Sequence, residues 1–217
     1  MKNNFSIIIS NTSRSYQYLK QLKKNKLIPK NIVYLNDGSN KLMAEKIKSN
    51  KFFFPKIIVK SFNANCINKN VAKFLLSKDI IYIIYSGYPG VIERNKKILK
   101  LKKLIHSHSG KLPQYRGSTT IYYSILKERK IYCSTIILNN NLDCGNILLI
   151  KKYPIPQKIS QIDKDYDDKI RANNIVYTLK KFKKFKNTKK NTKKNNPYYV
   201  IHPILRSLVF RKYAKNL

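Results

Sequence analysis

Short apolar runs rich in β-branched residues recur along the first half of the chain, about 25 residues apart. They are FSIIIS (5–10), NIVYLN (31–36), KIIVKS (56–61) and IIYIIYSG (80–87). Runs of this length, bounded by polar and turn-forming residues, predict buried strands. The stretches 15–24 and 68–77 between them have apolar residues at helical spacing, and Asn68 is placed to cap the second. The first half therefore alternates strand and helix.

This alternation predicts βαβ units, and so an α/β domain with a doubly wound, mostly parallel sheet that is covered on both faces. A fifth strand over 102–107, a helix over 118–129 and two more strands over 132–138 and 146–155 continue the pattern. Ligands of such sheets bind beyond the carboxyl ends of the strands. We therefore look for functional residues directly after each strand.

The length of 217 residues suits one substantial core with a short extension. We expect one domain over 1–179, a Lys/Asn-rich linker over 180–196 and an amphipathic segment over 197–217. Within that segment Pro203 begins a predicted helix with an apolar stripe formed by Ile204, Leu205, Leu208 and Val209. We expect this helix to dock on the domain, with a partner or a membrane surface as alternatives.

The net charge is +36, from 46 Lys and Arg against 10 Asp and Glu. A charge of this size is typical of proteins that bind nucleic acid or anionic membranes. Nearly all of the excess is Lys spread along the whole chain, whereas recognition of phosphates and bases favours Arg. We therefore interpret the charge as compositional bias and do not expect specific nucleic-acid binding.

Three further features bound the class of protein. No apolar run reaches the roughly 18 to 20 residues that cross a bilayer, and the first residues lack a secretory cleavage site. Cys66, Cys133 and Cys144 are odd in number and form no C-x-x-C pair, so we expect reduced thiols and a cytoplasmic protein. The acidic cluster DKDYDD (163–168) is interpreted as the start of a helix running to about Lys184, rather than as a metal site.

Two of the three histidines lie in HSHSGKLPQYRGSTT (106–120), at the end of the fifth strand. We expect His106 and His108 to point to opposite faces, which argues against one metal ion bound by both, and no metal is expected. A histidine exposed in the crevice can donate to a developing oxyanion, and Asp143, in the turn NNNLDCG (139–145), can hold or accept a proton. Such a pair suits acyl transfer to an amine.

The segments HSHSGKLPQYRG (106–117) and STIILNNNLDCGNILL (134–149) together resemble the folate-dependent formyltransferases. That family includes glycinamide ribonucleotide transformylase, methionyl-tRNA formyltransferase and the sugar N-formyltransferases. Its signature is a strand ending in Asn-x-His, a loop with a Gly, and later a Leu-Asp-x-Gly turn between two strands. The resemblance covers about residues 5–155. It implies the family's fold and transfer of a formyl group from 10-formyltetrahydrofolate to a primary amine.

The resemblance also implies roles for three residues. His108 and Asp143 match the family's catalytic His and Asp, whereas His106 stands where the family has Asn. The family's Asn donates a hydrogen bond to the formyl oxygen, and a His does so only in the right tautomer. The implied mechanism has His106 and His108 stabilising the oxyanion while Asp143 assists proton removal from the amine.

The segment YSGYPGVI (85–92) stands where the family binds folate, and 139–142 would close the other side of the same pocket. A plain strand-to-helix turn is the alternative interpretation of 85–92. The residues expected to contact the formyl donor are Tyr85, Gly87, Tyr88, Pro89, Gly90, Val91, Asn140, Asn141 and Leu142.

The acceptor amine is expected to contact Ser13, Arg14, Arg116, Gly117 and Ser118, with stabilisation of its own loop as the alternative role of Arg116. The loop after the first strand lacks the glycines of glycinamide ribonucleotide transformylases, and the chain after residue 156 is short for a tRNA-binding barrel domain. This leaves the amine of a nucleotide-linked amino sugar as the expected acceptor. A non-catalytic member that binds folate or an anion, and an RNA-binding module, stay open as alternatives. A homodimer is compatible with the sequence.

Overall fold

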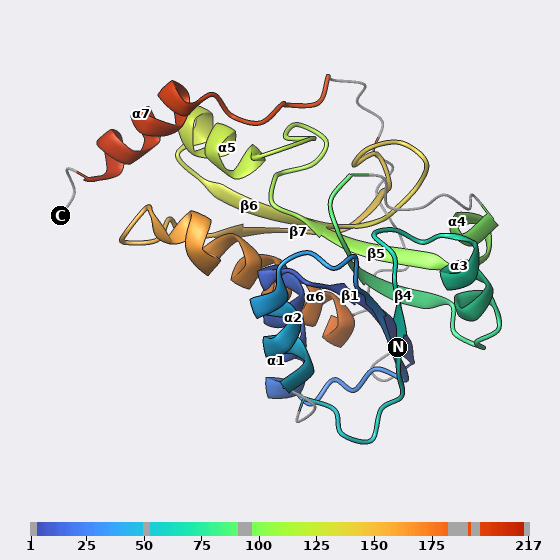
Figure 1. Ribbon diagram of the computed structural model, residues 1–217. Coiled ribbons are helices and arrows are strands. Elements are labelled where there is room, and N and C mark those ends of the chain that lie inside the picture. The colour runs from blue at the N-terminus through green and yellow to red at the C-terminus, as the bar shows by residue number, and fades with distance from the viewer. Residues whose placement is uncertain (1–3, 50–52, 91–96, 182–190, 192–195, 215–217) are drawn as a thin grey trace.

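The computed structural model describes residues 4–49, 53–90, 97–181, 191 and 196–214 (Figure 1). Within these residues seven strands form one sheet in the order β3-β2-β1-β4-β5-β6-β7. The strands are β1 (Phe5–Ser10), β2 (Asn31–Leu35), β3 (Val59–Phe62), β4 (Tyr82–Ser86), β5 (Lys103–His108), β6 (Ile131–Ile137) and β7 (Asn146–Tyr153). Strands β1 to β5 are parallel, whereas β6 and β7 each run antiparallel to the preceding strand. The predicted mostly parallel α/β sheet is confirmed.

Helices cover both faces of this sheet. They are α1 (Ser13–Lys24), α2 (Lys41–Ser49), α3 (Lys69–Leu76), α4 (Lys97–Leu101), α5 (Thr120–Glu128), α6 (Asp167–Lys181) and α7 (Pro203–Ala214), and a π-helical turn, η1 (Ile162–Tyr166), precedes α6. The core under α1, α2 and α6 contains Ile7 and Ile9 of β1, whereas the core under α3 and α4 contains Ile8. Because successive side chains of a strand point to opposite faces, an uninterrupted apolar run such as FSIIIS fills both cores.

The observed caps explain where two helices begin. Asn68 caps α3 as predicted, because its Oδ1 accepts hydrogen bonds from the backbone N–H groups of Asn70 and Val71, both at 3.1 Å. Helix α1 begins at Ser13, two residues before the expected start, because Thr12 Oγ1 accepts from the backbone N–H of Ser15 at 3.2 Å. One polar side chain therefore sets the start of α1, and another sets the start of α3.

Strand β3 departs from the sequence prediction in bounds and in burial. It spans 59–62 rather than 56–61, and Val59 keeps 52% of its surface exposed. The reason is its position at the edge of the sheet, where only β2 pairs with it. An apolar run therefore does not guarantee a strand covered on both faces.

The C-terminal helix α7 packs against α5, as Figure 1 shows, and the apolar stripe expected for it is wrong. Val209 is fully buried in a third core with residues of α5, β6 and β7, and Phe210 and Tyr213 pack against that core. The other members of the expected stripe, Ile204, Leu205 and Leu208, are exposed. The helix docks with its C-terminal half, so its apolar residues divide between two faces. Among the described residues, no helix is long and apolar enough to cross a membrane.

The topology places a crevice between β1 and β4. The chain leaves β1 through α1 to reach β2 on one side, and it later returns to form β4 on the other side. The carboxyl ends of β1 and β4 therefore face loops that run in opposite directions, which is where doubly wound sheets bind ligands. Strand β5 lies beside β4 and carries both neighbouring histidines to the same edge.

Candidate active site

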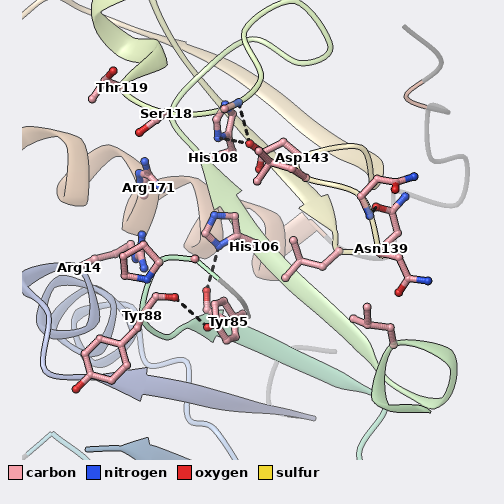
Figure 2. Close-up of a pocket in the computed structure, with 18 residues that line it drawn as sticks. Arg14, Tyr85, Tyr88, His106, His108, Ser118, Thr119, Asn139, Asp143 and Arg171 are labelled. Atoms are coloured by element: carbon pink, nitrogen blue, oxygen red, sulfur yellow. Dashed lines mark hydrogen bonds and ion pairs between the residues drawn. The ribbon is translucent and has the colours of Figure 1, made fainter. Parts of the chain in front are cut away.

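A cavity of about 570 Å³ opens at the carboxyl ends of β4 and β5 (Figure 2). This volume lies in the range of roughly 300–1,000 Å³ that is usual for small-molecule sites. Its lining comes from α1, β4 and the residues that follow it, α4, β5, the residues that precede α5, the segment 138–143 and α6. The lining residues are Arg14, Tyr85, Tyr88, Pro89, Gly90, Leu99, His106, His108, Gly117, Ser118, Thr119, Leu138, Asn139, Asn140, Asn141, Leu142, Asp143 and Arg171.

The two histidines of β5 share this cavity, so the expectation that they point to opposite faces is wrong. Strand β5 continues through His108, and residues two apart in a strand lie on the same face. His106 keeps 9% of its surface exposed and His108 keeps 4%. The extended geometry of β5 therefore delivers two buried imidazoles to one site.

His108 is held through both ring nitrogens. Its Nε2 lies 2.7 Å from the backbone carbonyl of Tyr115 and 3.2 Å from Thr120 Oγ1, whose own hydroxyl donates to the carbonyl of Ser109. Both partners accept, so Nε2 carries the proton. Nδ1 lies 3.5 Å from Asp143 Oδ2. Burial lowers the pKa of His108, and the Asp143 carboxylate opposes this shift. In the neutral ring, Nδ1 therefore presents a lone pair beside the carboxylate.

His106 is fixed in the opposite tautomer. Its Nδ1 lies 3.3 Å from the backbone carbonyl of Tyr85, which can only accept a hydrogen bond, so the proton is on Nδ1. Burial lowers the pKa of His106 well below its usual value, and the charges of Arg14 and Arg171 add to this effect. The neutral ring leaves Nε2 with a lone pair. The expected hydrogen bond from His106 to a formyl oxygen is incompatible with this arrangement.

Arg171 of α6 holds the strand residues on both sides of His108. Its Nη1 donates to the Ser107 carbonyl at 3.1 Å, and its Nη2 donates to Ser109 Oγ at 2.7 Å. Asp167 fixes the guanidinium, because both of its carboxylate oxygens accept from Arg171 Nε at 3.1 Å. Part of the acidic cluster thus supports the site from the first turn of α6.

Asp143 reaches His108 from the turn between β6 and β7. Its backbone φ is +50°, a left-handed conformation that Asp and Asn tolerate better than most residues. Its Oδ2 accepts from the backbone N–H of Gly117 at 3.0 Å. A Cβ on Gly145 would lie 1.8 Å from the carbonyl oxygen of Ile137, so only glycine lets the turn approach β6 this closely. Backbone geometry therefore explains the Asp and the Gly of the Leu-Asp-x-Gly pattern.

Most residues expected at the donor subsite line the cavity. They are Tyr85, Tyr88, Pro89, Gly90, Asn140, Asn141 and Leu142. Gly87 does not line it: its carbonyl accepts from Arg14 Nη2 at 2.5 Å, and a Cβ there would meet the ring of Tyr85. Val91 lies outside the described residues. The segment after β4 is thus part of the cavity wall and also anchors Arg14.

The residues expected at the acceptor subsite divide into two groups. Arg14, Gly117 and Ser118 line the cavity, whereas Ser13 and Arg116 do not. Ser13 is exposed and its hydroxyl donates to Asp168. Arg116 donates from Nη1 to Cys144 Sγ at 2.7 Å, so it ties its loop to the 139–145 turn. The alternative interpretation of Arg116, a loop-stabilising residue, agrees with this contact.

Four lining residues were not expected from the sequence: Leu99, Thr119, Leu138 and Arg171. Asn139 also lines the cavity, and it belongs to the 139–142 segment that was expected to close the pocket. Arg171 lies more than 60 residues after β5 and resembles any other cation in a chain with 46 Lys and Arg. No local sequence signal distinguishes it.

Comparisons with known proteins bear on the class of this site. No family model matches the chain. Methionyl-tRNA formyltransferase of Helicobacter pylori (strain 26695) is 35% identical over 68 residues, which are 31% of this chain and 22% of that protein. The corresponding protein of Sulfurimonas denitrificans is 25% identical over 123 residues, 52% of this chain and 40% of that protein. The chain thus spans less than half the length of these relatives.

Solved structures share the fold over nearly the whole chain. A 4-N formyltransferase from Francisella tularensis has a TM-score of 0.63 at 11% identity and covers 98% of this chain and 88% of its own. A sugar N-formyltransferase from Shewanella has a TM-score of 0.58 at 14% identity, with 96% and 87% covered. Glycinamide ribonucleotide transformylase from Symbiobacterium toebii has a TM-score of 0.59 at 12% identity, with 83% and 87% covered.

At these identities the structural likeness shows the fold alone, which is an α/β fold with a seven-stranded, mostly parallel sheet. The chain is thus similar in fold to several formyltransferases, and part of its sequence is similar to methionyl-tRNA formyltransferases.

Proposed function

We propose that the chain transfers a formyl group from 10-formyltetrahydrofolate to a primary amine. The observation that carries this proposal is the buried contact between His108 Nδ1 and Asp143 Oδ2 at 3.5 Å, inside a cavity at the carboxyl end of β5. A buried imidazole beside a carboxylate can take the proton that an amine loses when it attacks a carbonyl carbon. It can also place positive charge next to the developing oxyanion.

The residues around His108 have separate roles in this reaction. Tyr115 and Thr120 keep the proton on Nε2 of His108, so Nδ1 is the nitrogen that titrates. When Nδ1 is protonated, Asp143 balances its charge and the N–H becomes a hydrogen-bond donor inside the cavity. Arg171 limits movement of β5 around His108. The pair can therefore present a charged donor to the cavity without rearrangement of the backbone.

The cavity suits the formyl donor, which supplies the one-carbon group and a flat heteroaromatic ring. Leu99, Leu138 and Leu142 offer apolar surface for a ring face. The side-chain amides of Asn140 and Asn141 and the backbone around Gly90 offer donors and acceptors for its polar edge. A mostly apolar wall with a few polar groups is the usual composition of such a site.

We propose the amine of a nucleotide-linked amino sugar as the acceptor. The Shewanella structure, whose name specifies a sugar N-formyltransferase, matches this chain over 87% of its own length. Arg14 lines the cavity with a buried Nε that has no hydrogen-bond partner among the described residues, which suits an anionic part of the acceptor. The acceptor amine would then lie between Arg14 and the two histidines.

Methionyl-tRNA is the second candidate acceptor, because the curated relatives carry that name and the net charge of +36 favours a polyanion. The two candidates are separated by one experiment. Purified protein is incubated with 10-formyltetrahydrofolate and, separately, with nucleotide-linked amino sugars, glycinamide ribonucleotide or charged initiator tRNA, and products are identified by mass. Formylation of an amino sugar supports the first proposal, and formylation of the tRNA alone supports the second.

Variants connect the product to the site. His108→Ala and Asp143→Asn should each abolish transfer, and Asn is chosen at position 143 because it tolerates the left-handed backbone. His202→Ala is the matched control, since His202 is an exposed histidine at the start of α7. Equal activity of the His108 and His202 variants would contradict the proposed chemistry.

A further inference from the structure

The hydrogen bond between His106 and Tyr85 decides what this side chain offers to the cavity. With the proton on Nδ1, the neutral ring has one free nitrogen, Nε2, and this nitrogen can only accept. In Figure 2 the ring lies between Tyr85 on one side and His108 and Asp143 on the other. The lone pair on Nε2 of His106 is therefore available in the cavity as an acceptor.

The surroundings of His106 keep the ring neutral. The charged and titratable groups around it are Arg14 from α1, Arg171 from α6, His108 from the same strand and Tyr85 from β4. Arg14, Arg171 and His108 each disfavour a positive ring, and burial acts in the same direction. Asp143 lines the same cavity but makes its close ion contact with His108.

We propose that His106 is a catalytic residue that accepts a proton from the attacking amine through Nε2, instead of donating to the formyl oxygen. This inference rests on the proposed function. As the amine nitrogen bonds to the formyl carbon, Nε2 takes the N–H proton. As the bond between that carbon and the nitrogen of the donor breaks, His106 returns the proton to the departing nitrogen. The ring is neutral before and after the cycle, so atoms and charge balance.

The proposal gives the two histidines different tasks. His108 holds a proton on Nδ1 before the amine attacks and keeps it through the cycle, as a charged donor whose charge Asp143 balances, whereas His106 has two arginines nearby and releases its proton readily. A base that binds its proton weakly is suited to handing that proton on within one turnover. The site thus has one group for stabilising charge and another for moving a proton.

The tautomer is tested directly by NMR. The chain has three histidines, so a protein labelled with ¹⁵N-histidine gives three imidazole spin systems, which His108→Ala and His202→Ala assign. We expect His106 to show a protonated, pyrrole-type Nδ1 and an unprotonated, pyridine-type Nε2 at pH 7. A ring protonated on Nε2 would overturn the proposal, and this readout does not depend on activity.

The proton transfer is tested by the pH dependence of kcat/KM in wild type and His106→Gln. Gln can form hydrogen bonds but cannot take a proton, and it does not introduce the Asn of the resembled family, so we expect kcat to fall by about 100-fold. At pH values below the pKa of both rings, log kcat/KM should decrease as the pH is lowered. The slope of log kcat/KM against pH should be one unit greater for the wild type than for the variant. Protonation of the substrate amine is common to both proteins and cancels in this difference.

Parallel profiles, or a variant as active as the wild type, would contradict the role of His106 while leaving the proposed function intact. His106→Leu serves as the second substitution if the Gln variant does not fold. A wild type that transfers no formyl group to any amine in the panel would instead contradict the proposed function, and the role of His106 with it.

Discussion

Arg171 provides the most demanding test of how the site is held, because it touches neither Nδ1 nor Nε2 of either histidine. Replacing it with Met removes the hydrogen bonds to Ser107 and Ser109 and leaves Asp167 without its partner. Removing one member of a buried pair costs roughly 3–5 kcal/mol. The Asp167 side chain is 27% exposed, so water replaces part of the lost interaction and we expect about 2–3 kcal/mol of unfolding free energy to be lost.

The expected loss of activity has a different origin from the loss of stability. Without Arg171 the residues on both sides of His108 can shift, and a misplacement of about 1 Å costs roughly 100-fold in rate. We therefore expect kcat to fall by about that factor while KM changes little. Urea unfolding measures the first quantity, and formyl-transfer kinetics measure the second.

A double variant separates the two effects. In Arg171→Met with Asp167→Leu, no charge is left unpaired, so more than half of the lost stability should return. The hydrogen bonds to β5 remain absent, so kcat should stay low. Lys169→Met on the same helix is the control, because its pair with Asp165 is well exposed and should contribute less than about 0.5 kcal/mol. Full kcat in the double variant would refute the positioning role of Arg171.

Three further predictions concern stability and loop geometry. Asn174→Ala should cost about 2–3 kcal/mol in urea unfolding, because the fully buried amide donates to Thr135 Oγ1 at 2.8 Å; an unchanged midpoint would refute this. The pKa values of His106 and His108 are lowered in the folded protein, so the unfolded chain takes up protons first. Stability should fall between pH 6.5 and 5.5, by up to about 1.4 kcal/mol per ring, and the fall should shrink in His106→Asn. Gly145→Ala should displace the 139–145 turn and lower kcat, and a fully active variant would contradict the close approach.

The sheet was predictable from the sequence because its strands are continuous apolar runs with helical segments between them. The mostly parallel pairing of these strands and the helices on both faces of the sheet followed from general rules on βαβ units. The rules failed at β3, where an edge position left an apolar residue exposed, and at α7, whose buried face depends on how the helix meets α5. The local pattern of apolar residues indicates neither the edge position of β3 nor the packing of α7 against α5.

The site was predictable where its residues follow strands directly. His106, His108 and Arg14 each lie at or after a strand end, and Asp143 belongs to a recognisable turn. The expected orientation of the histidines was wrong because residues two apart in a strand share a face. The contribution of Arg171 and the tautomer of His106 depend on partners distant in sequence, so only the three-dimensional arrangement shows them.

We propose that the cavity beside His108 and Asp143 is where the formyl group is transferred to an amine. The most direct measurement is product mass after incubation with 10-formyltetrahydrofolate and each amine of the panel, for wild type, His108→Ala and His202→Ala. We predict one formylated product with the wild type and the His202 variant, and none with the His108 variant. A folded wild type that formylates no amine, or a His108 variant that forms product at the wild-type rate, would contradict the account.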